Sequence, residues 1–167
     1  YLASFFREAD PGLFPPVLHS AAILRHGKLI ACVSREPYSA ALPHAVYSFS
    51  KSVVTLAVGI AVGEGLLSPE DKAVSFFPEK QLFRSQRMAA GTIRHLLTMT
   101  SGANFNEAGG ETERDWVHAF FAADCTGTPG EQFRYNSMNS YLLAAILCRV
   151  TGQSLVDYLT PRLFDPL

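Results

Sequence analysis

Ser48 and Lys51 are the residues of this chain whose types and spacing offer the clearest chemistry. They open the stretch YSFSKSVVTLAVGIAVGEGLL, residues 47–67, and lie three positions apart. On a helix, this spacing puts both side chains on one face within the first turn. A lysine amine beside a serine hydroxyl can take the hydroxyl proton as the oxygen attacks an electrophile. The pair therefore has the composition needed for nucleophilic catalysis.

Lys51 can act as a base only if its pKa is lowered, because an ordinary lysine is protonated at neutral pH. The residues that follow it are apolar at most positions, including Val53, Val54 and Leu56. This run predicts a helix buried on nearly every face, with its first turn in a largely dry setting. Burial and the positive end of the helix dipole both disfavour the ammonium form. The free amides of the first turn would also favour negative charge on Ser48.

A purely structural interpretation of the same residues is that Ser48 caps the helix and Lys51 is a solvated charge. A capping box, however, has Glu or Gln three residues after the cap. Lysine at that position opposes the helix dipole. The tetrapeptide alone does not decide between catalysis and capping.

Composition excludes several classes of function. The chain has 167 residues, 48% hydrophobic and 17% charged, with a net charge of −1. A chain of this length can form one hydrophobic core, and its near-zero net charge does not favour binding to nucleic acid.

The cysteines and histidines argue against metal sites. Three separated cysteines predict neither a disulfide framework nor a zinc knuckle. We expect no metal and no cofactor, since the five histidines lack ligand spacing. No membrane segment is seen, and we expect a cytoplasmic protein, although a leader could precede Tyr1.

Turn and cap residues divide the chain into short elements. In the first part of the chain we expect a helix end within 1–10, a β-hairpin of 20–25 and 29–34 with Gly27 in its turn, and the central helix ending at Gly65 in a Schellman cap. A short helix should follow from Ser68, where Ser68 is the cap and Asp71 the acid three residues after it, and stop by Pro78; a helix over 93–99 should be capped by Thr92, and an exposed loop over 104–112 could border a cleft. The last part predicts an amphipathic helix within 113–123, an extended piece over 133–135, a helix over 140–150 ending at Gly152, and a last helix capped by Ser154 and broken by Pro161.

Four blocks in order carry a family resemblance: LRHGKLIA (24–31), YSFSKSVVTLAVGIAVGEGLLSPED (47–71), HLLTMTSG (95–102) and PGEQFRYNSMNSYLLAAILCRVTGQS (129–154). With these blocks the chain resembles the amino-terminal half of the serine β-lactamase and penicillin-binding-protein superfamily, in the branch of class C β-lactamases, esterases and DD-peptidases. The Ser-x-x-Lys signature belongs to related enzymes. The resemblance implies a mixed α/β (α+β) fold of the β-lactamase/transpeptidase type, an antiparallel sheet with a helical domain. This chain would supply the first hairpin and most of the helical part.

The resemblance also implies roles for individual residues. Ser48 matches the acyl-accepting serine, Lys51 its partner lysine, and Tyr135 the tyrosine of a Tyr-x-Asn motif. Here the run is Tyr135-Asn136-Ser137, so Ser137 stands where the family has asparagine. Because a hydroxyl can donate and accept like an amide, either Ser137 or Asn136 could support substrate binding.

A third family motif, a strand that contributes an oxyanion amide, has no counterpart after Ser154. We therefore interpret residues 1–167 as a single incomplete domain that lacks its carboxy-terminal strands and is inactive alone. No G-x-S-x-G elbow offers another route to a reactive serine. The expected activity is hydrolysis of a small ester, amide, lactam or peptide through an acyl-enzyme on Ser48. The alternative is a non-catalytic relative that binds a peptidoglycan-like or acyl ligand.

Overall fold

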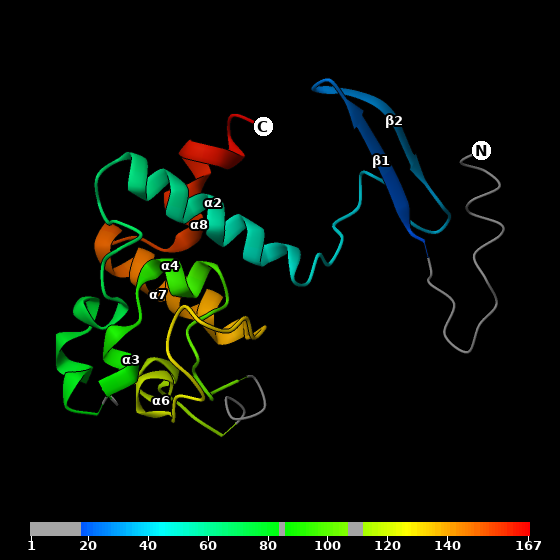
Figure 1. Cartoon of the computed structure of the whole chain (residues 1–167). Coiled ribbons are helices and arrows are strands. Elements are labelled where there is room, and N and C mark those ends of the chain that lie inside the picture. The colour runs from blue at the N-terminus through cyan, green and yellow to red at the C-terminus, as the bar shows by residue number, and fades with distance from the viewer. Residues whose placement is uncertain (1–17, 84–85, 107–111) are drawn as a thin grey trace, which may run out of the picture. The chain divides into compact units, whose positions relative to one another are not determined.

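The structure is a computed structural model that describes residues 18–83, 86–106 and 112–167. The chain divides into two compact units, residues 1–46 and residues 47–167, and each is described by itself. Figure 1 shows the hairpin of the first unit and the helices of the second. The helix end expected within 1–10 lies outside the described residues.

The first unit contains the predicted hairpin. Strand β1 (Ser20–Arg25) pairs antiparallel with β2 (Lys28–Ser34), from the Ser20–Ser34 pair to the Arg25–Lys28 pair. The two turn residues, His26 and Gly27, both have positive φ, 49° and 73°. Two residues with positive φ form the tight turn whose twist matches that of the strands. The prediction is confirmed, with β2 beginning one residue earlier than expected.

The central helix, α2, spans Phe49–Gly63. It ends as predicted: Gly65 has φ of 73°, Gly65 N donates to Val62 O at 3.0 Å and Leu66 N donates to Ala61 O at 2.9 Å. These are the two hydrogen bonds of a Schellman motif, which needs a residue that tolerates a left-handed conformation. Glycine at position 65 therefore stops the helix.

The prediction that α2 is buried on nearly every face is wrong within the described residues. Its buried positions form one stripe, Val54, Ala57, Val58 and Ala61, at the spacing of a single helix face. Leu56 is 53% exposed and Phe49 63% exposed. The many apolar residues of α2 therefore do not all pack on the other helices.

Short elements connect α2 to the rest of the second unit: η1 (Ala73–Phe76), η2 (Pro78–Phe83), α3 (Gln86–Ala90) and α4 (Ile93–Leu97). Thr92 caps α4 as predicted, in a capping box with His95. The helix expected after Ser68 is instead a turn followed by the 3₁₀ helix η1. The predicted cap contact is present there, since Ser68 N donates to Asp71 Oδ2 at 2.7 Å.

The remaining elements are α6 (Trp116–Ala122), α7 (Ser137–Thr151), α8 (Leu155–Leu159) and η3 (Thr160–Phe164). Helix α7 begins three residues before the predicted start, because Asn136 caps it by accepting from Met138 N. Ser154 caps α8 as expected. At Pro161 the chain does not stop but widens into the π-turn of η3, since proline lacks the amide that would continue the α pattern. Residues 133–135 carry no regular secondary structure.

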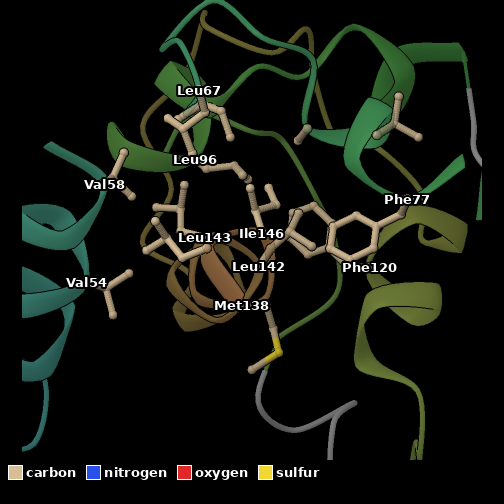
Figure 2. Packing of buried hydrophobic residues seen from close by; sticks show 14 of the residues in the cluster. Val54, Val58, Leu67, Phe77, Leu96, Phe120, Met138, Leu142, Leu143 and Ile146 are labelled. Carbon is tan, nitrogen blue, oxygen red and sulfur yellow. The ribbon is translucent and has the colours of Figure 1, made fainter. Parts of the chain in front are cut away.

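The core of the second unit is built around α7. Figure 2 shows Leu142, Leu143 and Ile146 of this helix with Val54 and Val58 of α2 on one side. Phe77, between η1 and η2, and Phe120 of α6 lie on the other side. Leu142 and Ile146 are fully buried. This packing fixes α7 against α2 and so fixes the start of α7 relative to the start of α2.

The carboxyl end of α2 is held by polar contacts. Glu64, just after the helix, accepts hydrogen bonds from Arg162 Nε at 2.7 Å and from the hydroxyl of buried Tyr158 at 3.0 Å. The Arg162 hydrogen bond is the largest cause of a lowered pKa for the Glu64 carboxyl, and partial burial opposes it. The contacts join α2 to α8 and η3.

The loop expected over 104–112 lies partly outside the described residues. Asn104 and Asn106 are exposed, whereas Phe105 between them is buried. Phe105 and Thr112 line a hollow of about 400 Å³ together with residues of α6. In the part of the chain that the structure describes, no single helix is both long and apolar enough to cross a bilayer.

Candidate active site

Ser48 lies immediately before α2, and its hydroxyl does not cap the helix. Its backbone has φ of −66° and ψ of −7°, and its side chain makes no cap hydrogen bond. The residue before it, Tyr47, has a positive φ of 43°. A left-handed conformation is costly for a bulky side chain and occurs often at functional sites. The capping interpretation of Ser48 is therefore wrong, and its hydroxyl is available for other contacts.

Two side chains converge on the hydroxyl of Ser48. Lys51, in the first turn of α2, donates from Nζ to Ser48 Oγ at 3.0 Å. The hydroxyl of Tyr135, 87 residues away in sequence, donates to the same Oγ at 2.9 Å. Lys51 Nζ also lies 5.1 Å from the centroid of the Tyr135 ring. The structure thus brings together the three residues that the sequence singled out as catalytic.

The phenol of Tyr135 is electrostatically perturbed. Its interaction with Lys51 is the largest cause that holds the pKa of Tyr135 below its ordinary value of 10.0, followed by the hydrogen bond to Ser48. Both neighbours stabilise the phenolate first by hydrogen bonding, and the positive charge of Lys51 adds a smaller effect. A tyrosine with a lowered pKa is better able to exchange a proton near neutral pH.

The expected dry setting is not present around these groups in the described residues. Ser48 is exposed, Tyr135 is 56% exposed and Lys51 is half-buried. Ser48 and Lys51 both precede Val54, the residue at which the buried stripe of α2 begins. Proximity of charged and hydroxyl groups, not burial, is what perturbs Tyr135.

The structure separates the two residues proposed for substrate binding. Asn136 is 5% exposed and turned inward, where its Nδ2 donates to Phe105 O at 2.7 Å and to Ala103 O at 3.3 Å. The Ser137 side chain lies near enough to the Tyr135 phenol to lower its pKa, but it contributes less than Lys51 and Ser48 do. Of the two residues, Ser137 therefore lies beside the site, whereas Asn136 holds the start of α7 against the 103–105 segment.

The sequence did not indicate the residues that hold the backbone next to Tyr135, namely Met99, Ser101 and Asn139. Arg134 N donates to Met99 O at 2.9 Å, and Met99 and Ser101 both contact buried Asn139. The HLLTMTSG block indicated a turn there, but no local pattern indicates that its backbone holds residue 134.

The described residues contain no group of three or more His, Cys, Asp or Glu side chains placed to hold a metal ion. All three cysteines are free, with Cys32 and Cys148 exposed.

The described fold is a mixed α/β arrangement of a two-stranded antiparallel sheet and a helical unit that carries a serine, a lysine and a tyrosine in mutual contact. A family model described as Beta-lactamase matches residues 16–167. The chain belongs to the beta-lactamase family.

Individual relatives agree with this assignment. Protein flp of Staphylococcus aureus strain NCTC 8325 is 30% identical over 129 residues, which cover 73% of this chain and 26% of that protein. D-alanine carboxypeptidase AmpC from Burkholderia cenocepacia superposes with a TM-score of 0.73 at 20% identity, covering 98% of this chain and 45% of the other. The octameric penicillin-binding protein homologue from Pyrococcus abyssi has a TM-score of 0.66 at 26% identity, covering 88% and 38%.

These comparisons also show how much of its relatives the chain represents. It spans about a quarter of the length of the curated relative and less than half of each solved structure. The similarity to the carboxypeptidase, at 20% identity, establishes the fold. The fold is of the β-lactamase/transpeptidase type, as the resemblance implied.

Proposed function

We propose that this chain carries the nucleophile of a serine hydrolase that acts on an ester, amide or lactam through an acyl-enzyme on Ser48. The observation that supports the proposal most strongly is the convergence of Lys51 and Tyr135 on one oxygen, Ser48 Oγ, at 3.0 and 2.9 Å. A hydroxyl that merely caps a helix or faces solvent has no need of two side-chain donors. Two groups able to exchange protons at a serine oxygen are the composition of an activated nucleophile.

The two hydrogen bonds suggest how protons move. A serine oxygen has two lone pairs, so with both neighbours donating to it, the proton of Ser48 points away from them. Attack requires that one neighbour first be deprotonated and then accept this proton, either the amine of Lys51 or the phenolate of Tyr135. The lowered pKa of Tyr135, caused first by Lys51, makes the phenol a better proton-exchanging group than an ordinary tyrosine.

The reaction then proceeds in two halves. Ser48 Oγ bonds to the carbonyl carbon, its proton passes to the Lys51/Tyr135 pair, and the pair returns a proton to the leaving alcohol or amine as the scissile bond breaks. Water attacks the resulting ester in the second half, with its proton following the same route. Ser137, which lies near the Tyr135 phenol, would contact the substrate. Asn136 is assigned a structural role.

The proposal places part of the catalytic machinery outside residues 1–167. Relatives of known structure are more than twice as long as the matched part, and the family's third motif supplies an oxyanion amide. One such donor is worth about 10²–10³ in kcat. We therefore expect residues 1–167 alone to turn over substrate poorly. Other relatives include a D-stereospecific amidohydrolase from Streptomyces, so D-amino amides and peptides belong in the substrate panel with esters and lactams.

The test compares hydrolysis by residues 1–167 with hydrolysis by a longer chain that includes the third motif, each with and without Ser48→Ala. We expect measurable turnover of an activated ester only for the longer chain, and its loss in the Ser48→Ala variant. Ser50→Ala is the matched control and should retain activity. Turnover by the longer Ser48→Ala variant would contradict the proposal. A folded longer chain that binds but never hydrolyses any panel member would favour a ligand-binding relative.

A further inference from the structure

Tyr135 lies on a segment with no regular secondary structure, and its own side chain is 56% exposed. Backbone contacts on its amino-terminal side help to set its position, together with the hydrogen bond to Ser48. Gly130 N donates to Thr100 O at 2.8 Å, and Arg134 N donates to Met99 O at 2.9 Å. The residue immediately before Tyr135 is thus attached to the carbonyl of Met99.

The segment that carries Tyr135 also lies directly against α4. A Cβ atom added to Gly130, which has φ of 96°, would come within 2.9 Å of His95 Nε2. Such a distance leaves no room for a side chain at position 130. The close approach shows that Gly130 packs against His95 of α4. Because Arg134 N also donates to Met99 O, a displacement of Met99 would be transmitted to the 130–135 segment.

Met99 itself has an unusual backbone conformation. It ends α4 with a positive φ of 56°, while Thr100 N donates to His95 O at 2.8 Å and Met99 N donates to Leu96 O at 3.3 Å. This is a Schellman arrangement, in which glycine normally occupies the left-handed position. A methionine there is strained and persists only when its surroundings hold it. The contacts of the Met99 side chain therefore matter for the direction of its carbonyl.

Asn139 supplies such a contact. Its side chain is fully buried, its Nδ2 donates to Met99 Sδ at 3.4 Å, and its Oδ1 accepts from Ser101 Oγ at 2.6 Å. One amide thereby holds the residues on both sides of Thr100. Asn139 lies in the first turns of α7, the helix that begins two residues after Tyr135. Met99 is therefore linked to Tyr135 from both directions along the chain. Arg134, just before Tyr135, donates to the Met99 carbonyl, and Asn139 of α7, just after it, donates to the Met99 sulfur.

We propose that Asn139 is a positioning residue for Tyr135, acting through Met99 and the carbonyl that receives Arg134 N–H. The inference rests on the proposed function, because it assumes that placing the Tyr135 hydroxyl on Ser48 Oγ serves catalysis. Asn139 does not touch the reacting atoms. It holds the left-handed turn whose carbonyl sets where Tyr135 lies.

Two substitutions remove the contact from opposite ends. Met99→Leu keeps the size of the side chain but lacks the sulfur acceptor. Asn139→Asp can still accept from Ser101 but offers no N–H to the sulfur. Ser101→Ala is the matched control, because it removes the other hydrogen bond of Asn139 and leaves the contact with Met99. If Asn139→Asp does not fold, Met99→Leu carries the test.

Two quantities are measured in the longer chain that carries the third motif. The first is the rate of Ser48 acylation by an activated ester, followed by intact mass. The second is the titration of Tyr135, followed by NMR of protein labelled with ¹³C at the tyrosine ring and assigned with Tyr135→Phe. The titration reports where the phenol sits relative to Lys51 and Ser48, and it does not depend on whether Ser48 reacts.

We expect Met99→Leu and Asn139→Asp to slow acylation about ten- to a hundredfold, as a displacement near 1 Å would. Their Tyr135 pKa should rise toward the ordinary value of 10.0. Ser101→Ala should change neither quantity, although it destabilises the fold. Equal effects of all three variants, or an unmoved Tyr135 titration in folded Met99→Leu, would overturn the inference. Normal acylation by Tyr135→Phe would instead refute the proposed function.

Discussion

Replacing Lys51 by arginine separates two roles that the geometry allows for this residue. In the structure Lys51 Nζ donates to Ser48 Oγ at 3.0 Å and lies 5.1 Å from the Tyr135 ring. It could accept a proton during the reaction, or it could act only as a fixed positive charge. Arginine keeps the charge but cannot be deprotonated in a protein. The substitution therefore removes proton exchange while leaving the field at Tyr135.

The size of the effect follows from the role. General acid–base catalysis by one positioned side chain contributes about 10²–10⁴ to the rate. If Lys51 exchanges protons with Ser48, acylation of Lys51→Arg should fall by a factor in this range. Lys51→Met removes the charge as well and should be at least as slow. The Lys51 side chain is half-buried and precedes Val54, where the core stripe of α2 begins, so the thermal unfolding midpoint should change little in either variant.

The assay is the time course of intact mass after mixing the longer chain with an activated ester. Lys72→Arg is the matched control, because Lys72 is exposed and lies far along the chain from Ser48. The control should acylate at the normal rate. Near-normal acylation by folded Lys51→Arg, together with loss in Lys51→Met, would refute the reasoning and leave Lys51 as a fixed charge.

Three further predictions concern other contacts. Tyr135→Phe should slow acylation about 10²–10⁴-fold with an unchanged unfolding midpoint, measured by intact mass and thermal melting, since the ring remains and the lost hydroxyl was exposed. The pKa of Glu64 is lower in the folded state than in the unfolded state, so its contribution to stability is complete above the unfolded pKa and is lost as pH falls through the folded pKa. In Glu64→Gln the free energy of unfolding, measured with urea, should therefore depend less on pH in the acid range. Ile146→Ala should cost about 2–5 kcal/mol in the same assay, because the side chain is fully buried.

Elements with local signals could be predicted from the sequence. The hairpin turn at Gly27, the end of α2 at Gly65 and the cap of α4 at Thr92 each depend on a residue whose conformational or hydrogen-bonding preference acts within a few positions. The family resemblance located Ser48, Lys51 and Tyr135, although their meeting depends on packing across 87 residues.

Features set by tertiary contact could not be predicted. The apolar character of Leu56 does not indicate that its side chain stays exposed on α2. Asn136 seemed equivalent to Ser137 because its carbonyl partners near Phe105 lie 31 residues away. Its assignment to a motif also hid its role as the cap of α7, so that helix was predicted to begin too late. The hydrogen bond from Asn139 to Met99 joins residues 40 positions apart, so no local sequence pattern predicts it.

The central claim is that Ser48, and not a neighbouring serine, is the nucleophile. Ser50 is a close competitor in sequence, but its side chain borders a separate apolar groove of about 290 Å³ between α2 and α8, with Val53, Val54 and Leu155 among its walls. The direct test is peptide mapping of the longer chain after labelling with an activated ester. We predict that the acyl group is found on Ser48 alone and that Tyr135→Phe slows its appearance. A label on Ser50, or on any residue other than Ser48, would contradict the account.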